Sequence, residues 1–198
     1  MNLRYLGDAL DHWKGSLLAR LQEARLLTLL AADAMASDEP DWTPPDRQLF
    51  ATLLRITPEQ IIRHHTHLAT DRATYFREIT HSTDLFLDPD TGIATGRVKN
   101  ASQYLRAAEL HALLGAYTSR VVSVYQHIRA ATTRSRLTAI MSVLSEGRHP
   151  FCCCSYESST VAMLFFSRDA ARVEAIHQHF AQLLGRHSTG RTYVWHHK

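Results

Sequence analysis

Two carboxylates stand one residue apart, directly after a short apolar run in the middle of the chain. The run covers residues 85–87 and continues into Asp88-Pro89-Asp90-Thr91-Gly92. In a turn, Asp oxygens accept local hydrogen bonds, while Pro fixes φ and Gly supplies a positive φ. At the end of a strand, the same two side chains can hold a divalent cation. The pattern therefore predicts either a structural turn or part of a metal site.

Polar residues also follow other segments that have the composition of strands. Gly7 and Asp8 end the run at 3–8, and His127 ends a β-branched run. In a parallel sheet the carboxyl ends of the strands meet at one edge, and ligands bind in the crevice there. Carboxylates and an imidazole around one crevice suit Mg²⁺ or Mn²⁺. The predicted ligands of this metal are Asp8, Asp11, Asp88 and Asp90.

Each of the other side chains at this predicted edge has a role that follows from its chemistry. His127 is expected to be a base or a ligand, and Lys14 is expected to contact a phosphate. Asp88 and Asp90 are expected to hold the ion that activates water, so they are predicted to be catalytic together with His127 and Lys14. Gly7 and Asp8 are expected to contact a cofactor.

Structural roles are open for each of these residues taken singly. Asp8 and Asp11 could cap a helix that starts near residue 12, and Asp88 could stabilise its turn. His127 could be a partly buried histidine with its hydrogen bonds satisfied. For the whole group this interpretation is weaker, because every strand end would have to be polar by accident.

Hydrophobic periodicity and turn signals place the elements that would position these residues. The predicted strands are 3–8, 84–88, 120–127, 151–157 and 160–167, with 26–35 either a strand or the continuation of a helix. The predicted helices are 16–25, 45–56, 57–68, 71–79, 100–117, 132–147 and 168–185, with a loop at 37–46 and a frayed tail at 195–198. This alternation predicts one α/β domain over 1–198, three-layered and Rossmann-like, with a mostly parallel sheet and a C-terminal antiparallel strand pair.

Composition limits the classes of protein that the chain can belong to. Its 198 residues suit one domain, and a net charge of +3 permits an anionic partner such as nucleic acid or a nucleotide without requiring one. No apolar run approaches the length of a membrane span, and the first residues do not resemble a signal peptide. The cysteines, at 152–154, are adjacent and are expected to be reduced thiols on a buried strand, with Cys153 facing opposite to its two neighbours. A cytoplasmic location is the default expectation, and the oligomeric state stays open.

Several families share motifs with this chain. The segment 84–92, the strand at 121–127 and the final strand pair resemble the second half of class I methyltransferase-like Rossmann proteins, although the GxGxG loop is missing and Asp90-Thr91 replaces their Pro-Tyr pair. Over most of its length the chain resembles a group of bacterial proteins without an established activity. These share a Tyr-x-Gly-Asp…Asp…Lys run, Asp-Pro-Asp-(Asn/Thr)-Gly and Tyr-Gln-His, here Tyr5 to Lys14, Asp88 to Gly92 and Tyr125 to His127. The Asp-x-Asp pair is also similar to the metal motif of Toprim nucleases and haloacid-dehalogenase-like phosphatases.

Three functional hypotheses follow. The first is a metal-dependent phosphoester hydrolase, nuclease-like, that acts on nucleic acid or nucleotides with Mg²⁺ or Mn²⁺. The second, which the methyltransferase-like resemblance implies, is a transferase that uses S-adenosylmethionine at the same edge. The third is a degenerate Rossmann domain that acts through protein contacts.

Overall fold

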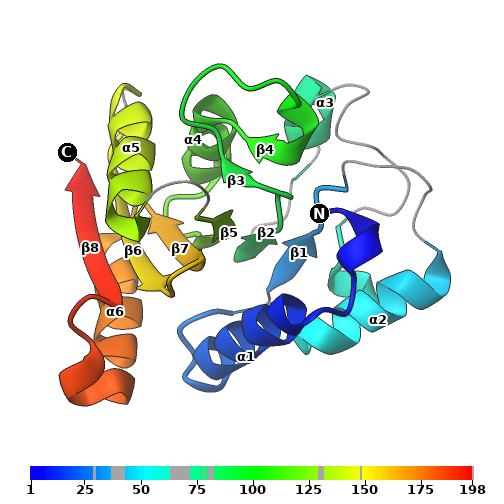
Figure 1. The fold of residues 1–198 in the computed structure, drawn as a ribbon, viewed down its shortest axis with the longest axis horizontal. Coiled ribbons are helices and arrows are strands. Elements are labelled where there is room, and N and C mark those ends of the chain that lie inside the picture. Colours follow the sequence, from blue (N-terminus) through cyan, green and yellow to red (C-terminus); the bar gives the residue numbers. More distant parts are fainter. Residues whose placement is uncertain are drawn as a thin grey trace.

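A mixed β-sheet lies at the centre of the molecule, between two layers of helices (Figure 1). The computed structural model describes residues 1–28, 30–36, 43–62, 72–77, 79, 83–128, 132–147 and 149–197. Within these residues the main sheet has six strands in the order β1-β2-β5-β7-β6-β8. The strands are β1 (Ala31–Asp33), β2 (Leu85–Leu87), β5 (Val122–His127), β6 (Phe151–Glu157), β7 (Val161–Ser167) and β8 (Thr192–His197).

The strand directions confirm the predicted fold class. β1, β2 and β5 are parallel to one another, while β7 runs antiparallel to both of its neighbours, β5 and β6. β8 is antiparallel to β6. Strands β1, β2, β5 and β6 therefore point the same way, as expected for a Rossmann-like α/β sheet closed by an antiparallel pair. A separate parallel pair, β3 (Gly92–Ile93) with β4 (Tyr104–Leu105), was not predicted.

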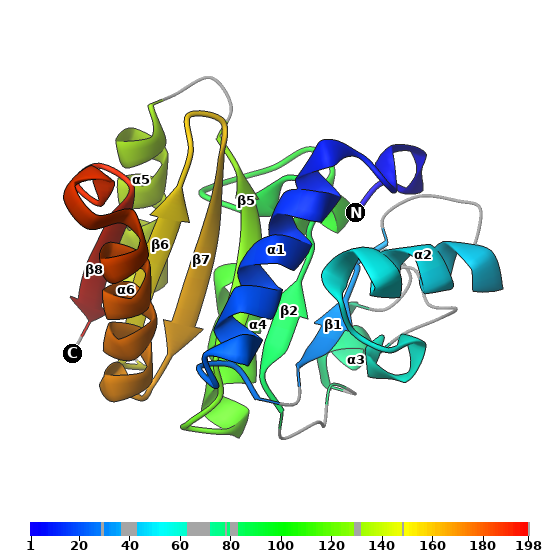
Figure 2. The ribbon, with the colours of Figure 1, turned by 90° about the horizontal axis from the view of Figure 1, so that it is seen from below.

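Helices cover both faces of the sheet, which gives three layers (Figure 2). One layer contains α1, α2 and α6, and the other contains α3, α4 and α5. The helices are α1 (Ala9–Glu23), α2 (Pro44–Leu54), α3 (Arg72–Arg77), α4 (Ala107–Ala116), α5 (Thr133–Ser145) and α6 (Ala170–Leu184). No helix in the described ranges is long and apolar enough to cross a membrane.

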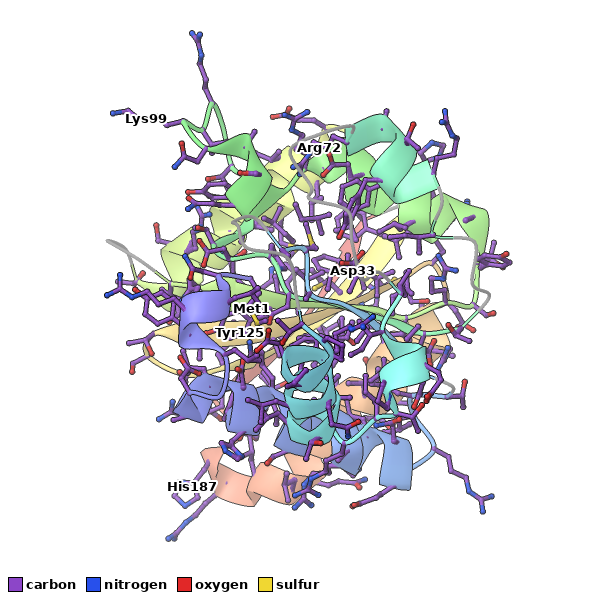
Figure 3. All side chains as sticks on the ribbon, turned by 90° about the vertical axis from the view of Figure 1, so that its right-hand side faces the viewer. Met1, Asp33, Arg72, Lys99, Tyr125 and His187 are labelled. Atoms are coloured by element: carbon purple, nitrogen blue, oxygen red, sulfur yellow. The ribbon has the colours of Figure 1, made fainter. Side chains whose placement is uncertain are left out.

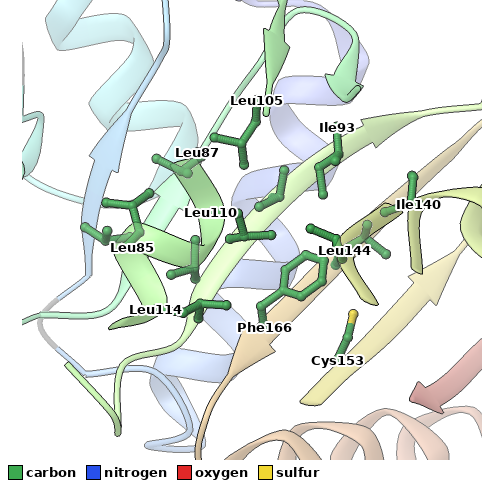
Figure 4. Packing of buried hydrophobic residues seen from close by; sticks show 14 of the residues in the cluster. Leu85, Leu87, Ile93, Leu105, Leu110, Leu114, Ile140, Leu144, Cys153 and Phe166 are labelled. Atoms are coloured by element: carbon green, nitrogen blue, oxygen red, sulfur yellow. The ribbon is translucent and has the colours of Figure 1, made fainter. Parts of the chain in front are cut away.

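Alternating side chains on the strands build a separate hydrophobic core on each face. Leu85, Leu87 and Phe166 point into the core beneath α4 and α5 (Figure 4). Cys153 joins this core, whereas Cys152 and Cys154 belong to the core on the opposite face. Successive side chains on a strand alternate in this way. The predicted alternation of the three cysteines is confirmed, and all three are free thiols.

A glycine sets how closely α1 and α2 approach each other. A Cβ atom added to Gly15 would lie 1.8 Å from the carbonyl oxygen of Leu53. Only glycine fits there, so Gly15 allows α1 to pack tightly on α2 and to lie over the sheet. α1 is also the helix that carries Asp11 and Lys14.

The predicted strand at 3–8 is wrong. Leu3–Tyr5 is a single 3₁₀ turn, and the Asn2 side chain accepts a hydrogen bond from the main-chain nitrogen of Arg4 at its start. Asp8 then caps α1, which begins at Ala9 rather than at the predicted residue 16. The apolar side chains of Leu3 and Leu6 pack against the core from this turn. Their burial explains why the stretch has the composition of a strand.

Other predicted elements differ in extent. The predicted helix at 57–68 is a 3₁₀ turn at Pro58–Gln60, after which Ile61 bridges to β1, and residues 63–68 lie outside the described part. The predicted helix at 100–117 starts only at Ala107, because residues 101–105 form a 3₁₀ turn and β4. The tail at 195–198 was predicted to fray, but its described residues 195–197 belong to β8, where pairing with β6 orders them.

Candidate active site

The turn at Asp88-Pro89-Asp90 follows β2 directly, at the carboxyl end of the strand. Asp88 is buried, and its main-chain nitrogen donates to the carbonyl oxygen of Asp33 at the end of β1. Its own carbonyl oxygen accepts a hydrogen bond from the main-chain nitrogen of Met1 at 2.8 Å. Asp90 is half-buried. The backbone thus fixes both carboxylates at the edge where parallel sheets bind ligands.

Gly92 allows the chain to leave this turn. Its φ is +112°, and an added Cβ would lie 2.3 Å from the Gln126 side chain. That side chain accepts from the main-chain nitrogen of Ile93 and donates to the carbonyl oxygen of Thr91. Both the positive φ and the close approach of Gln126 require glycine here. The Thr91-Gly92 part of the motif therefore has a structural role.

The start of α1 brings Asp8, Asp11 and Lys14 to the same pocket. The Asp8 side chain accepts from the main-chain nitrogens of Leu10 and Asp11, so Asp8 is the N-cap. Asp11 accepts from the main-chain nitrogen of Gly7, whose φ is +92°. The capping role foreseen as the structural alternative for Asp8 is therefore present in the fold.

Lys14 lies between two carboxylates that are far apart in the sequence. Its Nζ atom is 2.6 Å from Asp11 Oδ1 and 2.7 Å from Asp88 Oδ2, and all three side chains are almost fully buried. Burial alone lowers the pKa of Lys14, but the charges of Asp88 and Asp11 and the hydrogen bonds to them outweigh it, so the pKa is raised. Lys14 therefore stays positively charged and neutralises part of the acidic cluster.

The aromatic end of β5 closes the site. Lys14 Nζ lies 4.6 Å from the centre of the Tyr125 ring, which suits a cation–π contact. The rings of Tyr125 and His127 meet edge to face, with centroids 4.9 Å apart. Both side chains are on the α1 face of the sheet, since residues two apart on a strand share a face.

These residues surround one pocket of about 230 Å³ at the sheet edge. Of the predicted site residues, those that line it are Asp8, Asp11, Lys14, Asp88, Asp90 and His127. Gly7 is not among the lining residues, and its contribution is the turn before α1. Met1 and Tyr125, both labelled in Figure 3, line the pocket.

Sequence reasoning missed several lining residues, chiefly Tyr5, Tyr125 and Met1. Tyr125 stands two positions before His127 on the same strand, so the period of a strand could have indicated it. Tyr5 is the first residue of the Tyr-x-Gly-Asp run, but it was not assigned to the site, because the segment that carries it was expected to be a strand. The approach of Met1 to Asp88 depends entirely on tertiary structure.

The pocket does not contain a complete set of metal ligands. Over the described ranges, no group of three or more His, Cys, Asp or Glu side chains is arranged to hold a metal ion. The ammonium group of Lys14 takes the position between Asp11 and Asp88 that a cation would otherwise occupy. Of the four carboxylates that line the pocket, Asp8 and Asp11 belong to the start of α1. Asp88 and Asp90, on either side of Pro89, do not belong to a helix.

Comparison with known proteins identifies no relative: the chain matches no family model, no curated protein and no solved structure. The functional argument therefore rests on the geometry of the pocket.

Proposed function

We propose that the protein is a metal-assisted phosphoester hydrolase that acts on nucleotides or nucleic acid. One observation carries the proposal. Three segments that are distant in the sequence place four carboxylates, a buried lysine and a histidine around a single pocket. Perturbed, desolvated charged groups in a cleft are typical of catalytic sites.

Asp88 and Asp90 are the residues that would hold the metal. Mg²⁺ is usually bound by only one or two carboxylates, with water and substrate phosphate as its other ligands. The pair after β2 fits this mode, although it does not fit a fully protein-ligated ion such as structural zinc. When bound, such an ion lowers the pKa of a coordinated water and neutralises charge on the phosphoryl group.

The chain's own residues would prepare the pocket for an anionic substrate. Lys14 balances the charges of Asp11 and Asp88, which would otherwise repel a phosphate. His127 lines the pocket beside Tyr125. In the proposed reaction it would take a proton from the attacking water. Tyr5, at the rim and 59% exposed, offers a ring on which a nucleotide base can stack.

The size of the pocket favours hydrolysis over group transfer. Sites for whole small molecules have volumes of about 300–1,000 Å³. At about 230 Å³, this pocket suits a phosphate group better than an entire S-adenosylmethionine molecule. Gly7, the residue predicted to contact such a cofactor, is not part of the lining, so the transferase hypothesis has less support.

The test combines metal binding with activity. Mn²⁺ should raise the melting temperature of the wild type but not of Asp90→Asn, because that change removes a charge worth about 1–3 kcal/mol to a charged partner. Hydrolysis of a single-stranded oligonucleotide with Mg²⁺ should fall by about 10²-fold or more in His127→Asn, as for the loss of a general base.

Asp46→Asn is the matched control, because Asp46 is a half-buried carboxylate at the start of α2 and does not line the pocket. It should respond to Mn²⁺ as the wild type does. If Mn²⁺ shifts neither the wild type nor Asp46→Asn, the Asp88-to-Gly92 segment is only a turn and the hydrolase proposal fails.

A further inference from the structure

The two edges of the main sheet differ in how they are covered. At the β1 edge, Ile61 bridges to Ala32, and the main-chain nitrogen of Ile62 donates to the carbonyl oxygen of Ala32 at 2.8 Å. At the other edge, no strand among the described residues pairs with the outer side of β8. Figure 1 shows β8 at the margin of the molecule, next to α5.

The hydrogen-bond pattern determines which backbone groups of β8 face outward. The main-chain nitrogen of Glu157 donates to the carbonyl oxygen of Arg191 at 2.7 Å, so Arg191 faces β6. In an antiparallel pair, alternate residues point their N–H and C=O groups toward the partner strand and away from it. Residues 193, 195 and 197 therefore face β6. The outward groups belong to Thr192, Val194 and His196, and of these the Thr192 N–H already donates to the carbonyl oxygen of Ser188.

This open edge lacks the features that usually prevent association. Natural edge strands are protected by proline, by charged side chains, by bulges or by a covering loop. The strand Thr-Tyr-Val-Trp-His-His has no proline, lysine or carboxylate, and its register with β6 is unbroken from Tyr156 to Phe151. Its central residues 193–195 are half-buried, although they stand at the border of the fold.

We propose that β8 pairs with β8 of a second copy of this chain, antiparallel across a twofold axis at Val194. In this register Val194 lies opposite Val194 of the second copy, and Thr192 lies opposite its His196. The N–H and C=O groups of Val194, the C=O of Thr192 and the N–H of His196 are then paired between the copies, while the Thr192 N–H keeps its hydrogen bond to the carbonyl oxygen of Ser188. The arrangement is isologous, as in most homodimers, and it joins the two sheets into one.

The aromatic residues of β8 favour a second copy over an unrelated strand. In the proposed register, Tyr193 lies opposite Trp195 of the second copy, in the pair type with the closest side chains. Aromatic cross-strand pairs stabilise antiparallel strands. Both rings lie on the α5 face, where the Arg134 guanidinium is 4.4 Å from the centre of the Tyr193 ring and 5.4 Å from that of Trp195. The twofold axis produces this aromatic pair twice.

Light scattering after size-exclusion chromatography tests the proposal. Over a dilution series, the wild type should reach twice the 22.5 kDa mass of one chain. Val194→Pro should remain at the mass of a single chain, because proline removes an outward N–H yet is tolerated on an edge strand. Val194→Ala keeps the N–H and should behave as the wild type. A wild type that is monomeric at every concentration, or a dimeric Val194→Pro, overturns the proposal.

Cross-linking tests the register and does not depend on the folding of Val194→Pro. Cys154 is the cross-strand neighbour of Val194, so both cysteine variants are made in a Cys154→Ala background. Val194→Cys should form an intermolecular disulfide, because the two Cα atoms would be about 5.5 Å apart. Thr192→Cys should not, because its copies would be roughly 14 Å apart along the strands. Cross-linking of Thr192→Cys but not of Val194→Cys contradicts the twofold pairing at Val194.

Discussion

Lys14 carries a positive charge in a place that water hardly reaches. A buried ion pair costs desolvation energy, and only good geometry on both sides of the charge repays that cost. Here, Asp11 lies one helical turn away and Asp88 comes from a strand end 74 residues later. The same contacts that prepare the pocket therefore also attach α1 to the sheet.

Removing this lysine should destabilise the protein strongly. Lys14→Met keeps most of the side-chain volume but leaves Asp11 and Asp88 buried without their partner, and we expect a loss of about 3–5 kcal/mol in the free energy of unfolding. Urea denaturation measures the loss. Adding Asp88→Asn to Lys14→Met should recover part of it, since one uncompensated charge disappears. A loss below about 1 kcal/mol would show that water reaches the carboxylates.

At the scale of elements, the position of α1 depends on its contact with α2 more than on its own helix propensity. Gly15 lies against the backbone of Leu53 and Leu54. Gly115 on α4 has open space where a Cβ would be added. The two helical glycines thus form a matched pair in which the same substitution has opposite consequences.

Alanine at these two glycines should shift stability in opposite directions. Gly115→Ala should stabilise the protein by about 0.5–1 kcal/mol through helix propensity and reduced entropy of the unfolded chain. Gly15→Ala should destabilise it, by about 1–3 kcal/mol, because the new methyl group overpacks the contact between α1 and α2. Chemical denaturation of both variants measures the two shifts. Equal effects at the two positions would mean that α1 does not pack on α2 in this way.

The cysteine strand β6 gives the stability of the fold a dependence on alkaline pH. Burial raises the pKa of Cys153 and of Cys154 above the ordinary value of 9.0. Because the folded pKa is the higher one, the contribution of each thiol to stability is complete below pH 9.0. It is lost as the pH rises from there toward the folded pKa, since only the unfolded chain can release the proton.

The free energy of unfolding should therefore decrease as the pH rises above 9.0, by up to about 1.4 kcal/mol per pH unit for each buried thiol. Cys154→Ala should reduce this slope, whatever it does to stability at neutral pH. Urea titrations between neutral and alkaline pH measure the slope. An unchanged slope in Cys154→Ala would show that this thiol ionises in the folded state.

For the whole molecule, one arginine connects segments that the sequence separates widely. Arg172 on α6 makes two hydrogen bonds to the carboxylate of Asp84, just before β2, at 2.8 and 2.9 Å. It also donates to the carbonyl oxygens of Ser119 and Leu26. Arg172 thus links α6 to three other segments at the end of the sheet opposite the pocket.

Replacing this arginine should loosen the whole fold. Arg172→Leu leaves the buried Asp84 carboxylate without a positively charged partner, with only the main-chain nitrogens of Thr28 and Val121 still donating to it, and we expect a loss of about 2–4 kcal/mol in unfolding free energy. Arg172→Lys should restore little of it, because an ammonium group cannot make the two-pronged contact to a carboxylate. Thermal and urea unfolding of both variants measure these losses. Full rescue by lysine would mean that charge alone, and not geometry, holds Asp84.

Local chemistry made much of the fold predictable. β-branched and aromatic composition indicated β5, and the apolar runs at β6 and β7 indicated the antiparallel pair. The alternation of Cys152 to Cys154 followed from the period of a strand. Thr43 before two prolines began α2 close to the predicted position. Each of these signals depends only on a few neighbouring residues, so it can be recognised in the sequence alone.

The predictions of a strand at 3–8 and of fraying at 195–198 were wrong, because the structure of these segments depends on distant parts of the chain. Whether an apolar stretch becomes a strand depends on whether another strand is free to pair with it, and only the assembled sheet determines that. β8 forms because its residues pair with β6. Leu3 and Leu6 instead pack against the core from the 3₁₀ turn and its end, and are partly buried there.

The candidate site shows the same division. The polar residues at the ends of β2 and β5, namely Asp88, Asp90 and His127, could be predicted to lie together, because the topology of parallel strands brings their carboxyl ends to one edge. Asp8, Asp11 and Lys14 also line the pocket, but they reach it from the start of α1 and not from the predicted strand end. The placement of Lys14 between Asp11 and Asp88 could not be predicted, since it depends on how closely α1 approaches the sheet through Gly15. Residue types and their spacing are local properties, whereas the distance between two charges 74 positions apart is a property of packing.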